Sequence, residues 1–112
     1  MSEPDLERDV RRIREGYGQK LPGMLAELAE HLRGAREERA PEQRLETSSR
    51  LVHRLKGTSG SFGFDEVSAE LARIEAQLER LLSGATPNRV ASWTEIEQAL
   101  GRARAAVGSR TP

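Results

Sequence analysis

Residues suited to a helix core recur along the chain at spacings of three and four, which is the repeat of one helix face. They fall into five stretches, and no run of four or more residues alternates apolar and polar positions as a strand would. The sequence therefore predicts an all-α protein. The positions expected to face inward are Leu6, Val10, Ile13 and Tyr17 in the first stretch; Leu21, Leu25, Leu28 and Leu32 in the second; Leu45, Ser48, Val52, Leu55, Ser59 and Phe62 in the third; Val67, Leu71, Ile74, Leu78 and Leu81 in the fourth; and Val90, Trp93, Leu100, Ala103 and Val107 in the fifth.

Proline and glycine mark the expected ends of the first three helices. Glycines weaken the pattern at the end of the first stretch, and Pro22 suits the first turn of a second helix. Gly34 suits the end of that helix, and the charged segment 34–40 has no apolar repeat, which predicts a loop. A third helix would then open at Pro41.

The last two helices have similar signals. Asp65 suits the N-cap of a fourth helix that ends at Gly84, and Thr86 and Pro87 suit the cap and first turn of a fifth. Ser92 and Glu95 also fit a capping box, which leaves a later start for the fifth helix open. Short loops between helices of similar length favour antiparallel neighbours. We therefore expect an up-down-up-down antiparallel four-helix bundle with a short additional N-terminal helix laid against it.

Composition narrows the classes of function without choosing one. The 112 residues fit a single domain, which we expect to fill 1–112 with frayed ends at about 1–3 and 108–112. Lys and Arg total 18, as do Asp and Glu, and the zero net charge argues against non-specific nucleic-acid binding. The chain has no cysteine, and its two histidines fall on different predicted helices, so we expect no metal site.

The sequence also predicts where the protein is located and whether it forms oligomers. No apolar run is long enough to cross a membrane, and the acidic, polar N-terminus does not resemble a signal peptide. We therefore expect a cytoplasmic protein. The initial Met suggests a free-standing protein, and the sequence shows no large apolar patch that demands a partner copy, so we expect a monomer.

The segment 51–64 breaks the helical pattern, because three of the ten glycines fall within seven residues of it. Each glycine inside a helix costs about 1 kcal/mol relative to alanine. On a helical wheel, His53, Lys56, Gly57 and Gly60 share one face, about a third of a turn from the inward positions. An imidazole would thus stand over bare helix surface, where another molecule can approach it closely.

The charges around this imidazole have one sign. Arg50 and Arg54 flank His53, and Lys56 follows it by one turn. Lysine occurs only twice in the chain against sixteen arginines, so a compact, flexible charge at this position is a distinctive choice. Together these groups suit an anion such as phosphate held at the imidazole.

Simpler interpretations exist for each feature taken alone. A lone histidine on a helix is usually a surface residue, and His31 fits that description. The glycines could mean that the third helix ends at Gly57 and a loop follows. The combination of His53, Lys56 at i+3 and Gly57 at i+4 in a helical bundle favours a functional site over these readings.

The run His53-Arg54-Leu55-Lys56-Gly57-Thr58-Ser59, with Gly63 after it, resembles the H-x-L-K-G-[ST]-[ST]…G signature of histidine-containing phosphotransfer (HPt) domains. The resemblance extends over most of the chain, since the segment from Leu71 to Glu75 looks like the family's fourth helix and 21–32 looks like its second. Val52, where the family often has Ala, and a longer charged loop before the third helix depart from the pattern.

The resemblance implies a phosphocarrier of a two-component phosphorelay. His53 would accept a phosphoryl group from an aspartate of a response-regulator receiver domain, or donate one to it, with a histidine kinase or hybrid kinase upstream. Lys56 would stabilise the charge of the phosphate, Gly57 would leave room for the partner, and Mg²⁺ would come with the receiver. Thr58 and Ser59 could bond locally or pack inward. The residues expected to contact the partner are Arg50, Arg54, Gly60, Ser61 and Phe64.

The residues themselves show no nucleotide-binding motif and no pair of carboxylates near His53 in sequence, so we expect no kinase or other enzyme activity. Two alternatives stay open. One is a helical docking module that binds a receiver domain or a histidine kinase without carrying phosphate. The other is a structural bundle with no partner, which the cost of the glycines disfavours.

Overall fold

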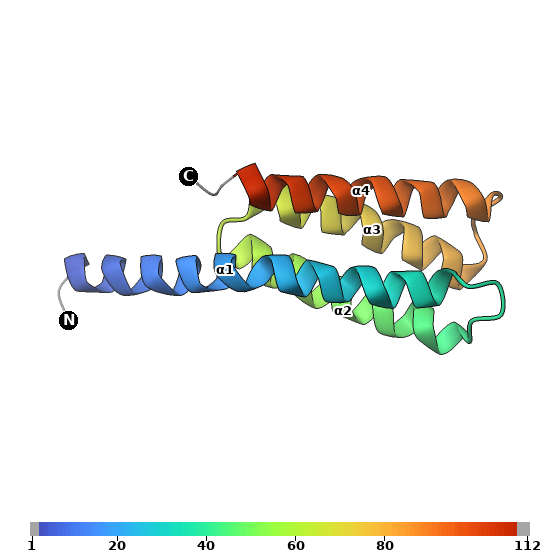
Figure 1. The fold of residues 1–112 in the computed structure, drawn as a ribbon, viewed down its shortest axis with the longest axis horizontal. Coiled ribbons are helices and arrows are strands. Elements are labelled where there is room, and N and C mark those ends of the chain that lie inside the picture. The colour runs from blue at the N-terminus through green and yellow to red at the C-terminus, as the bar shows by residue number, and fades with distance from the viewer. Residues whose placement is uncertain (1–2, 110–112) are drawn as a thin grey trace.

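A computed structural model describes residues 3–109, and this part of the chain contains four α-helices and no strand. The all-helical prediction is confirmed. Figure 1 shows the chain reversing direction at each connection between helices. The helices are α1 (Glu3–Arg36), α2 (Glu42–Ser61), α3 (Asp65–Ser83) and α4 (Arg89–Ser109).

The helices form a ring in which each packs on its sequence neighbours and α1 closes against α4. The buried positions follow the predicted spacing closely, since every residue expected to face inward on α3, and all but Phe62 on the third stretch, is buried. Phe62 follows the end of α2 and is half-buried. None of the four helices has the length and apolar character needed to span a bilayer.

The separate N-terminal helix is not present, because α1 continues without a break through Pro22. Packing against the rest of the bundle accounts for this continuity. The Tyr17 ring stacks on Phe62 with centroids 4.8 Å apart. A Cβ at Gly18 would come within 2.9 Å of the Phe64 ring, so this glycine admits the ring. Tyr17 and Gly18 before the expected break, and the fully buried Leu25 after it, thus all pack on the bundle, which keeps the chain in one helix.

The first part of α1 extends beyond the bundle, and we call residues 3–16 the arm (Figure 1). The 34 residues of α1 span roughly 51 Å, whereas the 20 of α2 span roughly 30 Å. No other described helix therefore runs beside the arm. Leu6, Val10 and Ile13 are exposed, and the expectation that they face inward against the bundle is wrong.

The end of α1 differs from the prediction, whereas the start of α2 agrees with it. Gly34 lies inside α1, which ends at Arg36, so it is not the cap. A Cβ at Gly34 would meet only the end of the exposed, flexible Arg44 side chain on α2, which can move aside. Pro41 is the N-cap of α2, close to the predicted start.

The N-caps of α3 and α4 differ from those predicted, whereas the C-cap of α3 agrees with the prediction. Asp65 is the first residue of α3 and Phe64 is its N-cap, so the assignment of Asp65 as the cap is wrong. Gly84 is the left-handed cap of α3, with φ +71°, as predicted. Thr86 and Pro87 lie outside α4. Its first turn is capped by Asn88, whose side-chain oxygen accepts the N–H of Ala91 at 3.0 Å.

Two further expectations concern the last helix and the chain ends. Val90 is exposed rather than inward-facing, while Trp93, Ala103 and Val107 are buried and Leu100 is half-buried. The ends expected to fray, 1–3 and 108–112, are helical at Glu3 and over 108–109. Their remaining positions lie outside the described residues.

Candidate functional site

The glycine-rich segment continues as helix, since α2 runs to Ser61 rather than ending at Gly57. His53, Lys56 and Gly57 therefore share a rigid surface. The His53 side chain is 71% exposed. A Cβ at Gly57 would meet no atom within 4 Å, so no contact within the described residues requires a glycine there. The bare surface beside His53 is therefore available to another molecule.

A carboxylate from α3, Glu75, completes the site, and its contact with His53 was not predicted from the sequence. Glu75 Oε2 lies 2.6 Å from His53 Nδ1, and Glu75 Oε1 lies 2.5 Å from Lys56 Nζ. The Glu75 side chain is only 13% exposed, whereas Lys56 is 30% exposed. One buried carboxylate thus bridges the imidazole and the ammonium.

The pKa of Glu75 lies below its usual value of 4.5. Burial alone would raise the pKa, because a carboxylate loses hydration inside the protein. The hydrogen bonds from Lys56 and His53, together with the charges of both groups, outweigh that effect. Glu75 is therefore ionised at neutral pH.

A close contact between α2 and α3 sets this register. The Ser68 hydroxyl donates to the backbone carbonyl of Lys56 at 3.0 Å. A Cβ at Gly60 would stand 3.2 Å from the same hydroxyl, so the glycine allows the two helices to approach. The turn between them needs Gly63, whose φ of +81° is strained for residues with a side chain. These glycines position Glu75 opposite His53.

The bridge determines which ring nitrogen can react. An ionised carboxylate only accepts hydrogen bonds, so the proton of the contact with Glu75 sits on His53 Nδ1. In the neutral ring, Nε2 then carries the free lone pair. The arrangement therefore presents a nucleophilic nitrogen to solvent, backed by a carboxylate and beside an ammonium. Among residues with described side chains, no group of three or more His, Asp or Glu residues could hold a metal ion.

The Hpt domain family model matches residues 17–106. The chain belongs to the Hpt domain family. Hpt domains are phosphotransfer modules of two-component signalling, and the matched range contains His53, Lys56, Gly57 and Glu75. No curated protein and no solved structure matches the chain.

The Hpt match begins at Tyr17, the residue that follows the arm, so residues 3–16 lie outside the matched range.

The residues expected to dock a partner of this Hpt domain separate into two groups. Arg50, Arg54 and Ser61 are exposed on α2, and Gly60 is exposed while also touching Ser68. Phe64 is only 7% exposed, so the expectation that it lies on the accessible face is wrong. Its ring packs over Gly18 of α1, and the wheel failed there because α2 ends before it.

Two hydroxyls that follow His53 have distinct local roles. Thr58 donates to the carbonyl of Arg54 at 2.9 Å, a bond within α2. Ser59 is fully buried, with its hydroxyl 2.9 Å from the hydroxyl of Tyr17. Neither hydroxyl is bonded to His53.

Proposed function

We propose that this protein is a phosphocarrier in which His53 Nε2 accepts a phosphoryl group from an aspartyl phosphate of a receiver domain and returns it to such an aspartate. The observation that carries the proposal is the bridge from Glu75 to both His53 Nδ1 and Lys56 Nζ. This bridge leaves Nε2 as the nucleophilic nitrogen on an exposed surface.

The transfer needs no external proton acceptor. The Nε2 lone pair forms a bond to phosphorus while the bond from phosphorus to the aspartate oxygen breaks, and the carboxylate leaves with that electron pair. Nδ1 keeps its proton, so the ring becomes a phosphoimidazolium cation. Glu75 faces this cation and stabilises its charge. In the reverse step Nε2 leaves as a neutral imidazole nitrogen.

The basic residues beside His53 support the same chemistry. Phosphoryl transfer depends mainly on positioning and on neutralising the charge of the phosphoryl oxygens. The ammonium of Lys56 has three donor hydrogens, so it can bind a phosphoryl oxygen as well as Glu75. Arg50 and Arg54, exposed on the same helix, complement the acidic phosphorylation site of a receiver domain.

The remaining parts of the reaction belong to the partners. In this proposal the receiver brings Mg²⁺, which neutralises phosphoryl charge, and a histidine kinase or hybrid kinase supplies the phosphoryl group from ATP. The protein then carries the group without making it, and acts as an intermediate rather than an enzyme. We place the exchange in the cytoplasm, where ATP feeds such a relay.

A transfer assay tests the proposal. Purified protein is mixed in Mg²⁺ with receiver domains that carry radiolabelled aspartyl phosphate. We expect label on the wild type and none on His53→Gln. His31→Gln is the matched control, because His31 is the other histidine and is also exposed. Equal labelling of His53→Gln and wild type would refute the proposal.

The same assay separates the phosphocarrier from a docking module. Receiver binding is measured by calorimetry alongside transfer. A phosphocarrier loses transfer in His53→Gln while it keeps receiver binding. A docking module binds the receiver with no label on any variant, including the wild type.

A further inference from the structure

The arm presents an apolar face that no described part of the chain covers. The exposed fractions of Leu6, Val10 and Ile13 are 54%, 45% and 58%. Their spacing of four and three residues places them on one side of α1. We call these three residues the apolar stripe. Only one other large apolar residue, Val90 on α4, is comparably exposed among the described side chains.

The stripe has the same spacing that further along α1 forms the core. Leu21, Leu25 and Leu28, separated by four and three residues, are each 0% exposed. An isolated helix as short as the arm is marginal in water, and Gly16, the last residue of the arm, weakens it further. A helix with an apolar face gains most of its stability by packing that face, so the arm needs a surface to cover it.

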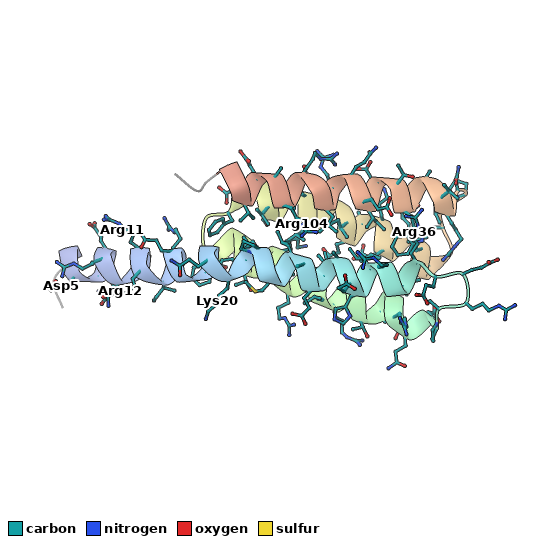
Figure 2. The ribbon with its side chains drawn as sticks, in the orientation of Figure 1. Asp5, Arg11, Arg12, Lys20, Arg36 and Arg104 are labelled. Carbon is teal, nitrogen blue, oxygen red and sulfur yellow. The ribbon has the colours of Figure 1, made fainter. Side chains whose placement is uncertain are left out.

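The charges of the arm indicate what that surface is. Glu7 and Asp9 flank the stripe towards its free end, and Arg14 flanks it towards the bundle. The other charged side chains described in the arm lie further round the helix, and among them Arg8 pairs with Asp5 at 3.7 Å. Figure 2 shows Asp5 near the free end of the arm, with Arg11 and Arg12 nearer the bundle. A surface complementary to the arm is therefore apolar along its middle, basic opposite the free end and acidic nearer the bundle.

The arm itself has that pattern when its direction is reversed. We propose that the arm binds the arm of a second copy of this chain, antiparallel, across a two-fold axis. A two-fold interface uses the same patch on both copies, so a patch with opposite charges at its two ends complements itself. A parallel pair would instead set acidic against acidic and basic against basic.

Coiled-coil geometry gives the pairing. Antiparallel packing sets Val10 of each copy against Ile13 of the other, with Leu6 at each end of the contact. Glu7 of each copy then lies beside Arg14 of the other, which makes two equivalent ion pairs. The contact is short, so a weak dimer is expected, below the size class of stable interfaces.

This inference differs from the monomer expected from the sequence, where the stripe was assigned to the bundle. It does not depend on the phosphocarrier proposal. His53 lies eight residues before the end of α2, or about 12 Å along the helix from the end that faces the arm. Pairing of the arms therefore leaves His53 exposed in both copies.

Sedimentation velocity over a concentration series from micromolar to millimolar tests the dimer. We expect the mass to rise from 12.4 kDa towards twice that value with concentration. Ile13→Glu places a charge in the stripe and is expected to raise the dissociation constant by roughly tenfold or more. Val90→Glu is the matched control, since Val90 is 70% exposed but lies on α4, and it should leave the dissociation constant unchanged.

Charge reversal tests the direction of the pair. Glu7→Arg and Arg14→Glu should each weaken the dimer, and the double variant should restore it. A mass of 12.4 kDa throughout the series overturns the proposal, as does a dimer that Ile13→Glu leaves intact. If the wild type stays monomeric and Ile13→Glu weakens binding of a receiver domain, the stripe belongs to receiver docking and the second-copy proposal is wrong.

Discussion

The two faces of α2 differ in how they are specified. The inward face consists of Leu45, Ser48, Val52, Leu55 and Ser59, all buried and all placed by their spacing. The outward face carries His53 and Gly57, both exposed. Where another helix packs beside α2, spacing along the helix identifies which residues are buried, because residues three and four apart share one face.

The outward face acquires its chemistry from another helix. His53 is bonded to Glu75, which lies 22 positions along the chain on α3. No repeat within α2 contains that contact. The spacing of a core face can be recognised within one helix, whereas the chemistry of a reactive face depends on the register between two helices.

The largest expected effect is that of Gly57→Leu on the outward face, which should stabilise the protein but slow phosphoryl transfer. Gly57→Leu places a side chain in open space, so the free energy of unfolding should rise by about 0.8 kcal/mol through helix propensity. The same side chain should obstruct the receiver. Because misplacing the reacting atoms by about 1 Å costs roughly hundredfold, we expect transfer to fall by at least that factor.

Gly101→Leu is the matched control for this substitution. Gly101 is an exposed glycine in α4, and a Cβ there also meets no atom within 4 Å. Both variants should be stabilised against urea, but only Gly57→Leu should slow transfer. Normal transfer by Gly57→Leu would show that the bare surface is not where the receiver docks.

A smaller effect on the transfer rate is expected from a substitution of Glu75, the residue of α3 that contacts the outward face. Glu75→Gln keeps an oxygen that accepts the Nδ1 proton of His53 but removes the negative charge that faces the phosphoimidazolium. We expect transfer to slow by roughly tenfold, less than the hundredfold or more that follows outright loss of a fixed polar group. Glu79→Gln, one turn further on the exposed surface of α3, should leave the rate unchanged.

The same variant should change how stability depends on pH. The pKa of Glu75 is lower in the folded protein than its usual 4.5, so ionised Glu75 stabilises the fold above pH 4.5. That contribution is lost as the pH falls below 4.5 towards the folded value. Urea unfolding of wild type and Glu75→Gln should therefore differ by a constant amount near neutral pH and converge in acid. A difference that stays constant into acid would contradict the bridge.

Much of the bundle was predictable from the sequence because helix spacing and left-handed caps are local properties. The inward positions of α3 and the cap at Gly84 illustrate this. The arm was not predictable in the same way. Its stripe has the spacing of a core face, and only the relative lengths of α1 and α2 leave it uncovered.

Part of the site was predictable because it, too, depends on spacing within one helix. His53, Lys56 and Gly57 lie within one turn of each other, so a helical wheel brings them together. Glu75 could be placed only by the close approach at Gly60 and the turn at Gly63. Both glycines are visible in the sequence, but the register that they set is a property of two packed helices.

The smallest expected effect lies on the inward face, in a comparison of its two serines. Both Ser48 and Ser59 are fully buried. The Ser59 hydroxyl is 2.9 Å from that of Tyr17, whereas the Ser48 hydroxyl has no hydrogen-bond partner. A buried polar group without a partner costs free energy, and one with a partner contributes about 1 kcal/mol.

Ser48→Ala should therefore leave the free energy of unfolding unchanged or raise it by up to about 1 kcal/mol, since it removes a hydroxyl that is desolvated without a bond. Ser59→Ala is the control with equal burial and equal gain in helix propensity. It should be less stable than Ser48→Ala by about 1 kcal/mol, because it leaves the Tyr17 hydroxyl without Ser59 as its partner. Urea unfolding of both variants measures the difference. If Ser48→Ala proves the less stable of the two, the inward face of α2 uses the Ser48 hydroxyl in a bond, and apolar spacing alone does not account for that face.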